Sequence, residues 1–359
     1  MTKKIIFSTG GTGGHIFPAI NLMKHFSEKG YEVLIVTDNR GNNFIKRTSE
    51  FKSYILKTST LTNKNFTKKF FSIFIIFYSI IKSIIILKKE KPDLIFGFGG
   101  YVSFPISFVS NFFKVPLLIY ENNMILGRAN RYLSKFSKKI FIAKNIETNF
   151  PKEYKKKTYE VGSILSKDII NTSLSAKDKN KSNFTILVLG GSQGAEIFGT
   201  IIPSTIAKVK KLGYEIEVIQ QCLLNQKDSI NSFYDRNNIK NYVFDFDKNI
   251  LKLILRADLA ISRCGASTTS ELAHTITPFI AVPLPDSIDN HQYLNAKYYE
   301  TKGCCMILEQ KNFNTDNLFN LIIATVKNKN KLEIMRTNMK KSYRNNVYID
   351  IENHIKEII

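Results

Sequence analysis

Two glycine-rich stretches decide the fold, IIFSTGGTGG at residues 5–14 and ILVLGGSQG at residues 186–194. In both, apolar or small residues precede Gly-Gly, a hydroxyl residue, any residue and Gly. A buried strand that turns through glycines into a helix presents backbone N–H groups and the positive helix end to anions. Neither stretch matches GxGxxG or GxxxxGK[ST], so a dinucleotide site or a P-loop has little support. The repetition predicts two Rossmann-like halves that face each other across a cleft.

Short apolar runs alternate with helical stretches along the rest of the chain. We predict a strand over residues 4–8, a helix over 16–29 and a strand over 31–37. Further strand candidates are residues 94–98, 116–120, 139–143, 215–219, 242–246, 259–262 and 279–282. This alternation predicts an α/β protein with doubly wound parallel sheets.

A polar stretch separates the two halves. Residues 165–183 read LSKDIINTSLSAKDKNKSN and lack periodic apolar positions, which indicates a linker. We therefore expect an amino-terminal domain over residues 1–163, a linker region over 164–183 and a carboxyl-terminal domain over 184–336.

The chain is strongly basic, with 52 Lys and Arg against 30 Asp and Glu and a net charge of +22. Nucleic acid, an anionic membrane surface and a Lys- and Asn-rich coding bias each explain such a charge. The basic residues are mostly Lys and are spread along the chain, which favours bias as a large part of the explanation. No RNP-like aromatic motif or Arg-rich tract is present, so we expect no nucleic-acid partner.

The cysteines and the amino terminus indicate in which cellular compartment the protein resides. The four cysteines show no CxxC spacing, which is simplest to explain by a reduced cytosol. Only Ile5, Ile6 and Phe7 follow the charged start before polar residues and glycines, too few for a signal-peptide core. We expect the protein to stay inside the cell.

A third stretch, SRCGASTTSEL at residues 262–272, runs from a predicted strand into a helix that we expect to begin near Thr268. Its small and hydroxyl residues suit an anion, and Glu271 could accept hydrogen bonds from sugar hydroxyls. The alternative is a capped helix in which Glu271 serves the cap. DNHQYLNA at residues 289–296 follows the next strand, at the same carboxyl edge of the sheet.

Five motifs together carry a resemblance to a known family. They are GGTGGHIFPA (10–19), GFGGYVSFP (97–105), LGGSQGA (189–195), SRCGASTTSEL (262–272) and DNHQYLNA (289–296). In this order they resemble MurG, the family of bacterial peptidoglycan N-acetylglucosaminyltransferases. The resemblance implies a two-domain glycosyltransferase B fold, with residues 337–359 packing back on the first domain. It also implies transfer of N-acetylglucosamine from UDP-N-acetylglucosamine to undecaprenyl-linked lipid I, giving lipid II.

The resemblance implies two binding sites. The acceptor diphosphate would meet Gly10, Gly11, Thr12, Gly13 and Gly14. The donor would meet Thr12, Gly13, Gly14, Asn123, Ser166, Ser192, Asp247, Ala266, Ser267, Thr268, Thr269, Ser270, Glu271 and Gln292. Among these, Glu271 would bind the ribose hydroxyls and Gln292 a hydroxyl of the donor sugar, while backbone groups near Ser267 and Thr268 would meet the donor diphosphate.

Three positions depart from the family pattern. Ser166, in the stretch GSILS at residues 162–166, replaces a donor-contacting arginine, and only Lys167 stands nearby. The family's HEQN is YENN at residues 120–123, which keeps Glu121 and Asn123. Asp247 occupies a position beside the uracil that is commonly apolar.

The charge changes of the reaction suggest a mechanism. The acceptor hydroxyl loses a proton as it attacks the anomeric carbon, and a histidine with an ordinary pKa of about 6.5 suits this task. We predict His15 as the general base; the alternative is an imidazole that caps a helix or packs a loop. Helix N-termini suit the departing UDP, and attack opposite the leaving group inverts the anomeric configuration.

We expect no metal and no cofactor. Asp245-Phe246-Asp247 resembles the DxD pattern that holds a divalent ion in other glycosyltransferases, and strand periodicity would place both aspartates on one face at a strand end. Such short patterns also occur by chance. Transfer is therefore expected to continue in excess chelator.

Residues 70–87 form the most apolar run of the chain, with lysines on both sides. Three interpretations stay open: a core helix, a helix with one face on the membrane, and a membrane span. The family acts at the cytoplasmic face of the inner membrane, so the resemblance implies a peripheral protein that binds anionic lipid and possible wall-synthesis proteins. Two rival activities are transfer to a diacylglycerol acceptor and epimerisation of a UDP-sugar on the same scaffold.

Overall fold

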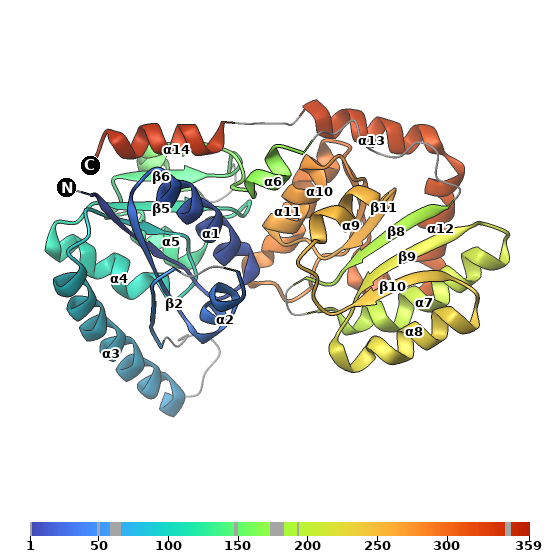
Figure 1. Ribbon diagram of the computed structural model, residues 1–359, viewed down its shortest axis with the longest axis horizontal. Helices are drawn as coiled ribbons and strands as arrows, with labels where there is room; N and C mark the ends of the chain where they lie inside the picture. Colours follow the sequence, from blue (N-terminus) through green and yellow to red (C-terminus); the bar gives the residue numbers. More distant parts are fainter. Residues whose placement is uncertain are drawn as a thin grey trace. The chain divides into compact units, whose positions relative to one another are not determined.

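The computed structural model describes residues 2–48, 51–57, 66–146, 150–172, 183–191, 194–341 and 346–359. The chain forms two compact units (Figure 1). Unit 1 comprises residues 1–166 and 344–359, and unit 2 comprises residues 167–343.

Unit 1 contains a seven-stranded sheet in the order β3-β2-β1-β4-β5-β6-β7, with every neighbouring pair parallel. The strands are β1 (Lys4–Ser8), β2 (Glu32–Thr37), β3 (Ser53–Ile55), β4 (Leu94–Gly97), β5 (Leu117–Glu121), β6 (Lys139–Ile142) and β7 (Thr158–Glu160). The helices are α1 (Gly13–Glu28), α2 (Asn39–Thr48), α3 (Phe66–Glu90), α4 (Ser103–Ser110), α5 (Arg128–Leu133) and α14 (Val347–Lys356). Short 3₁₀ turns η1 (Asn111–Phe113) and η2 (Lys152–Lys157) complete it.

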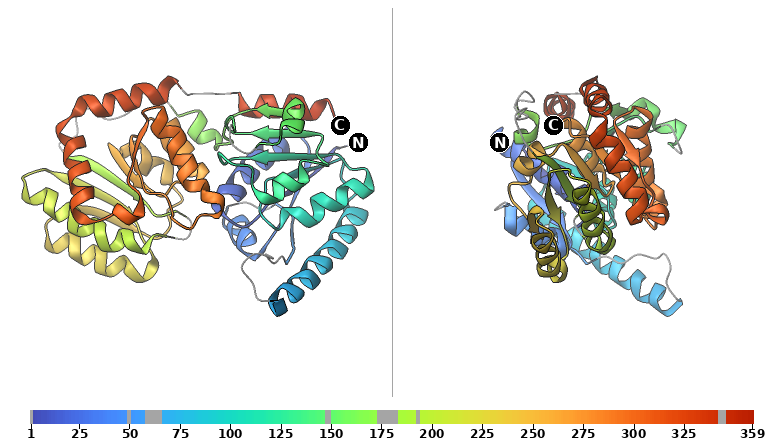
Figure 2. Two further views of the ribbon diagram at one scale, coloured as in Figure 1. Left: turned by 180° about the vertical axis from the view of Figure 1, so that it is seen from behind. Right: turned by 90° about the vertical axis from the view of Figure 1, so that its right-hand side faces the viewer.

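Helices cover both faces of this sheet. On one face, Ile6 and Ile95 share a core with buried residues of α3, α4 and α5. On the other, Phe7 packs against Phe26 of α1, and Phe141 packs against His354 of α14. Figure 2 shows α3 at the periphery of the unit, away from α14. Side chains alternate between the two faces because successive strand residues point in opposite directions.

Unit 2 contains a six-stranded parallel sheet in the order β10-β9-β8-β11-β12-β13. The strands are β8 (Phe184–Leu189), β9 (Ile216–Gln221), β10 (Lys240–Phe244), β11 (Leu259–Ser262), β12 (Phe279–Ala281) and β13 (Cys305–Ile307). The helices are α6 (Lys167–Ile170), α7 (Glu196–Lys211), α8 (Lys227–Arg236), α9 (Ile250–Arg256), α10 (Ala266–His274), α11 (His291–Thr301), α12 (Thr315–Lys327) and α13 (Lys329–Lys341), with 3₁₀ turns η3 (Leu224–Gln226), η4 (Ile288–Asn290) and η5 (Gln310–Asn312).

This sheet is also covered on both faces. One core joins buried residues of α7, α8 and α12 with Ile186 and Val188 of β8. The other joins α9, α10 and α11 with Leu187 and Leu189 of the same strand. Two doubly wound parallel sheets are therefore present, as the repeated stretches predicted.

Three element boundaries correct the predictions, and one of them is the start of helix α10, which lies at Ala266 and not near Thr268. Helix α1 begins at Gly13 and not at Ile16, because residues 13–15 already form its first turn. Strand β10 ends at Phe244 and not at Phe246, so Asp245 and Asp247 lie beyond the strand and share no strand face. The predicted linker contains α6, and its residues 173–182 lie outside the described residues.

Candidate functional site

Each sheet has one place where the strand order reverses, between β1 and β4 in unit 1 and between β8 and β11 in unit 2. In open parallel sheets, ligands bind beyond the carboxyl ends of the strands at this switch point. The two repeated glycine stretches follow β1 and β8. The sequence repeat therefore occupies the same ligand-binding position in both units.

In unit 1 the loop after β1 packs directly on the loop after β4. The N–H of Gly10 donates to the carbonyl of Gly99 at 2.9 Å. Gly100 has φ +80°, and a Cβ added there would lie 2.7 Å from the Cα of Gly10. Both positions therefore need glycine for contact between backbones, independently of any ligand.

Gly14 differs from these two glycines. A Cβ added to Gly14 would meet no heavy atom within 4 Å, so packing within the protein does not demand glycine there. It lies in the first turn of α1, whose N-cap residue Thr12 makes no side-chain capping bond. An uncapped first turn with bare backbone is suited to a bound anion.

Pro18 and Asn122 complete the start of α1. Proline has no N–H, so Pro18 leaves the carbonyl of Gly14 without its usual helical donor. The Nδ2 of Asn122 lies 3.4 Å from this carbonyl and supplies a donor from the end of β5. The helix start is thus tied to the neighbouring loop.

His15 is the third residue of α1 and is half-buried. Its backbone N–H donates to Thr12 at 3.0 Å, and its ring lies beside Gly99. A Cβ added at Gly99 would be 3.3 Å from Cε1 and 3.5 Å from Nδ1 of His15. The glycine after β4 therefore makes room for the imidazole at the carboxyl edge of the sheet.

The end of β5 is organised by Glu121, which is fully buried. One of its oxygens accepts from the N–H and the side-chain amide of Asn123, and the other from Gly127 N–H and Asn130 Nδ2. These four donors hold the loop that presents Asn123. Tyr120, which stands where the family has histidine, donates to the carbonyl of Gly162 at 3.1 Å.

In unit 2 the amino end of α10 has the same character as that of α1. Its N-cap is Gly265, which has no side chain to cap the helix, whereas Ser, Thr, Asp or Asn would accept a bond from the first turn. An added Cβ at Gly265 would meet nothing within 4 Å. The first helical bond to Gly265 comes from Thr269 N–H, at 3.0 Å. The first turn thus lacks a side-chain cap, which suits a diphosphate.

Helix α11 holds the loop that leads into α10. The Oε1 of Gln292 accepts from Cys264 N–H at 3.1 Å and from Leu284 N–H at 3.0 Å. One turn later, Asn295 Nδ2 donates to the carbonyl of Cys264 at 3.1 Å. Because the oxygen of Gln292 already accepts two backbone bonds, its NH₂ group is the part that can serve a ligand. Asn295 and Glu121 hold loops of the candidate site, and we did not select either as a site residue from the sequence, although the spacing of Gln292 and Asn295 places both on one helix face.

Glu271 lies in the second turn of α10. Burial among protein atoms raises the pKa of its carboxyl from 4.5 to about 7, and no described residue makes a hydrogen bond or ion pair with that carboxyl. A desolvated carboxylate without a partner gains from any hydroxyl donor that reaches it. This favours the ribose-binding interpretation over a role in the helix cap.

The remaining predicted residues have varied surroundings. The hydroxyl of Thr269 bonds to Gly265 and Ala266, and that of Ser270 accepts from Tyr299, so these side chains serve the protein itself. Gly10 to His15, Asn123 and Ser166 lie in unit 1, whereas Asp247, Ala266 to Glu271 and Gln292 lie in unit 2. Ser192 lies outside the described residues.

Asp247 is engaged by its own loop. Its oxygens accept from Tyr242 Oη at 2.8 Å and from Asn249 N–H at 2.6 Å. Asp245 lies 3.9 Å from the ammonium of Lys227. Among the described residues, no group of three or more His, Cys, Asp or Glu side chains is arranged to hold a metal ion.

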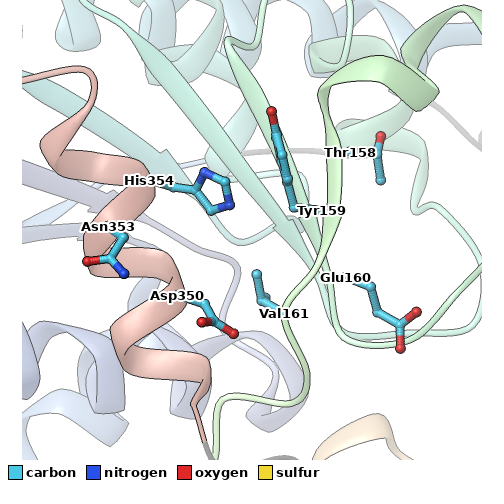
Figure 3. Close-up of a pocket in the computed structure, with 7 residues that line it drawn as sticks. All are labelled: Thr158, Tyr159, Glu160, Val161, Asp350, Asn353 and His354. Atoms are coloured by element: carbon cyan, nitrogen blue, oxygen red, sulfur yellow. The ribbon is translucent and has the colours of Figure 1, made fainter.

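A shallow pocket in unit 1 lies between β7 and α14 (Figure 3). His354 faces Tyr159 there, with ring centroids 4.1 Å apart, while Glu160 points away. Burial, together with Lys139 at 3.0 Å, lowers the pKa of His354. The residues that line this pocket include none of the predicted site residues, and its histidine packs α14 onto the sheet.

Comparison with known families identifies the chain. The model of the glycosyltransferase family 28 N-terminal domain matches residues 5–142, and that of the C-terminal domain matches residues 185–348. The chain belongs to glycosyltransferase family 28.

Two relatives match over the whole length of this family 28 chain. One from Pelagibacter ubique is 35% identical, with 100% of this chain and 99% of the relative covered. One from Rickettsia canadensis is 37% identical, with 99% and 100% covered. Both are named UDP-N-acetylglucosamine–N-acetylmuramyl-(pentapeptide) pyrophosphoryl-undecaprenol N-acetylglucosamine transferase.

Solved structures support the fold. Acinetobacter baumannii MurG superimposes with a TM-score of 0.80 at 24% identity, covering 99% of this chain and 100% of that one. A structure of MnaA from S. aureus with UDP superimposes with a TM-score of 0.70 at 13% identity, covering 99% and 96%. At these identities the likeness concerns the fold alone.

Proposed function

We propose that this protein transfers N-acetylglucosamine from UDP-N-acetylglucosamine to the muramyl 4-hydroxyl of undecaprenyl-pyrophosphoryl-MurNAc-pentapeptide, lipid I, and so produces lipid II for peptidoglycan. The observation that carries the proposal is the full-length match to relatives of that name at 35% and 37% identity. The two glycine loops at equivalent switch points support it, because the reaction brings together two diphosphate-bearing substrates.

The donor belongs to unit 2 in this proposal. The amino end of α10 offers N–H groups and a helix dipole to the UDP diphosphate. Glu271 accepts hydrogen bonds from the ribose hydroxyls, and the NH₂ group of Gln292 donates to a hydroxyl of the sugar. The same helix end stabilises the charge on UDP as it leaves, without a metal ion.

The acceptor belongs to unit 1. Its diphosphate lies against the open backbone at Gly14, and its 4-hydroxyl is deprotonated by His15. The hydroxyl oxygen attacks the anomeric carbon opposite UDP, the bond to the diphosphate breaks, and the proton passes to the imidazole. This geometry inverts the anomeric configuration.

Helix α3 supports a peripheral membrane location, because it is apolar on its outer side. Its serines 72, 79 and 83 are buried, and Lys82 Nζ donates to the carbonyl of Ile55 at 2.8 Å. The outer side exposes six large apolar residues, Ile73, Phe74, Phe77, Tyr78, Ile81 and Ile85. Such an exposed patch marks an interaction surface. No helix in the described part of the chain combines the length and apolarity that spanning a bilayer requires.

Charge points to the same surface. Unit 1 holds 29 Lys and Arg against 13 Asp and Glu, whereas unit 2 holds 23 against 17. The excess positive charge is concentrated in the unit that carries α3, and Lys88 and Lys89 lie in the last turn of this helix. We infer that unit 1 rests on the cytoplasmic face of the membrane through this helix, close to its lipid-linked substrate.

The transfer reaction is tested with labelled UDP-N-acetylglucosamine and a lipid I analogue in excess chelator. We expect label in the lipid I product, and none in a parallel reaction with diacylglycerol. Transfer to diacylglycerol instead would establish the first rival activity. Conversion of the UDP-sugar without any acceptor would establish epimerisation.

His15→Gln tests the general base. We expect at least about a 100-fold loss in kcat with an unchanged KM for the donor and an unchanged melting temperature. The acid limb of the pH–rate profile should also disappear. Near-normal turnover by the folded variant would remove His15 from the mechanism.

Vesicle flotation tests the membrane surface. Phe77→Glu combined with Ile81→Glu should abolish flotation with vesicles that contain phosphatidylglycerol, while the melting temperature stays the same. Ile349→Glu is the control, because Ile349 is equally exposed on α14 of the same unit. Flotation that survives the α3 changes would refute this surface.

A further inference from the structure

Arg263 is a buried cation at the end of β11. Only 7% of the surface of Arg263 is exposed to solvent. One terminal nitrogen donates to the carbonyls of Val282 and Pro283, both at 3.2 Å, and the other donates to Oε1 of Gln310 at 2.6 Å. The guanidinium also lies 4.9 Å from the ring centre of Phe198.

All of these partners are neutral. Among the described residues, no carboxylate lies within ion-pair distance of Arg263, and burial lowers the pKa of its guanidinium. Buried arginines are normally paired with acids, because removing a charge from water costs several kcal/mol. Arg336 of the same unit shows the usual arrangement, since it contacts both Asp258 and Glu333.

The position of Arg263 indicates where its positive charge can act. The residue follows β11 at the switch point, and its Cβ lies 3.8 Å from the place of a Cβ on Gly191 in the loop after β8. It comes two residues before Gly265, which caps α10. Its bonds to Val282, Pro283 and Gln310 fasten the loops after β12 and β13 to the segment that leads into α10.

We propose that Arg263 is a positioning residue for the donor, which holds an uncompensated positive charge beneath the diphosphate subsite and has that charge balanced when a nucleoside diphosphate binds. This inference rests on the UDP donor of the proposed function. The guanidinium hydrogen bonds stay within the protein, so Arg263 acts through the loops and the electric field. Salt and water screen the electric field of a buried charge less than that of a charge on the surface, so the field of Arg263 reaches the site.

The test compares UDP with uridine, which differ in the diphosphate alone. Affinities are measured by calorimetry at pH 8, where the terminal phosphate is ionised. For R263Q we expect the ratio of UDP to uridine affinity to fall at least about tenfold, or about 1.4 kcal/mol. R263K keeps the charge without the planar fork, so its ratio should stay within about threefold of wild type while its melting temperature falls.

R336Q is the matched control. It breaks the ion pairs of another poorly exposed arginine, so it should lower the melting temperature and leave the UDP to uridine ratio unchanged. Equal losses of UDP and uridine in R263Q would overturn the proposal, as would a lowered ratio in R336Q. If R263Q does not fold, R263K decides: a preserved ratio supports the proposal, and a collapsed ratio overturns it.

Only binding is measured, so the outcome is separate from that of the transfer assay. A protein that binds UDP as expected but leaves lipid I unchanged keeps this inference and loses the proposed acceptor. A wild-type protein that prefers uridine to UDP loses the inference whatever its acceptor is.

Discussion

Replacing Glu271 by Gln should stabilise the protein and weaken the donor site at the same time. The carboxyl lies among protein atoms without a partner, and its burial raises its pKa from 4.5 to about 7. The folded state therefore binds the proton more tightly than the unfolded state does. Wild-type stability is highest below pH 4.5 with respect to this group, and part of it is lost as the pH rises to 7.

The size of the effect follows from the shift. A difference of about 2.5 between the folded and unfolded pKa values corresponds to roughly 3.4 kcal/mol of lost stability, and this loss is complete above pH 7. Because the residue keeps some contact with solvent, we expect Glu271→Gln to gain about 1–3 kcal/mol in free energy of unfolding at pH 8. Below pH 4.5 wild type and variant should be equally stable.

Donor binding should show the opposite dependence. Hydroxyl groups of the ribose favour the charged carboxylate, so wild-type affinity for UDP-N-acetylglucosamine should rise between pH 5 and pH 7 and then level off. The phosphates of this donor are diesters that stay ionised throughout, so the slope reports the protein. The variant should bind more weakly at pH 8, with a flat profile.

Urea unfolding and calorimetry at pH 4.5, 6 and 8 measure both effects. Glu309→Gln is the control, because the Glu309 side chain is 45% exposed and pairs with Lys311. A gain in stability that is equal at all three pH values would refute the desolvation argument. A UDP-N-acetylglucosamine affinity with the same pH slope in the variant would refute the role of the carboxylate.

Two further predictions concern unit 1. The carboxylate of Glu90 accepts a hydrogen bond from Lys52 at 2.8 Å, and bonds of this kind outweigh the effect of burial and lower the pKa of Glu90 to about 2. Glu90→Gln should therefore lower the free energy of unfolding by about 2–3 kcal/mol at pH 7. Urea titrations should show that this difference shrinks below pH 4.5. Gly100→Ala should lower the free energy of unfolding by at least about 2 kcal/mol, because the added Cβ meets Gly10. Gly14→Ala should leave the melting temperature unchanged and lower transfer to lipid I. Equal melting temperatures for the two variants would contradict the packing argument.

The sequence predicted the sheets well because their strands are short and buried on both faces. Residues 4–8 and 259–262 read as apolar runs and form strands with the expected limits. The strands β3, β7 and β13 have three residues each and escaped prediction. So short a segment has no measurable period, and its pairing depends on the strand beside it. The strand β12 is equally short and was predicted only because it begins the apolar run at residues 279–282.

The start of α1 was misplaced for a related reason. Glycine has a low helix propensity, so Gly13 and Gly14 pointed to a loop that would continue to Ile16. In the structure, Asn122 donates to the carbonyl that Pro18 leaves open, and residues 13–15 become the first turn. The backbone N–H of Ile16 closes this turn on the carbonyl of Thr12 at 3.0 Å, and the bond from Asn122 comes from a distant loop that the local sequence does not report.

The candidate site likewise depends partly on local sequence motifs and partly on tertiary contacts. Glu271 and Gln292 were selected from motifs, but the reason each is available to a ligand is tertiary. Glu271 is largely removed from water without gaining a partner, and Gln292 has its oxygen occupied by the backbone N–H groups of Cys264 and Leu284. Arg263 stood in the same motif, and only the neutral character of its contacts distinguishes it from an ordinary structural arginine. A motif therefore locates the residues of such a site, whereas their charge state and their free hydrogen-bonding groups depend on packing. The UDP and uridine comparison is the direct measure of that second property, because it separates the charge beneath the site from the contacts that line it.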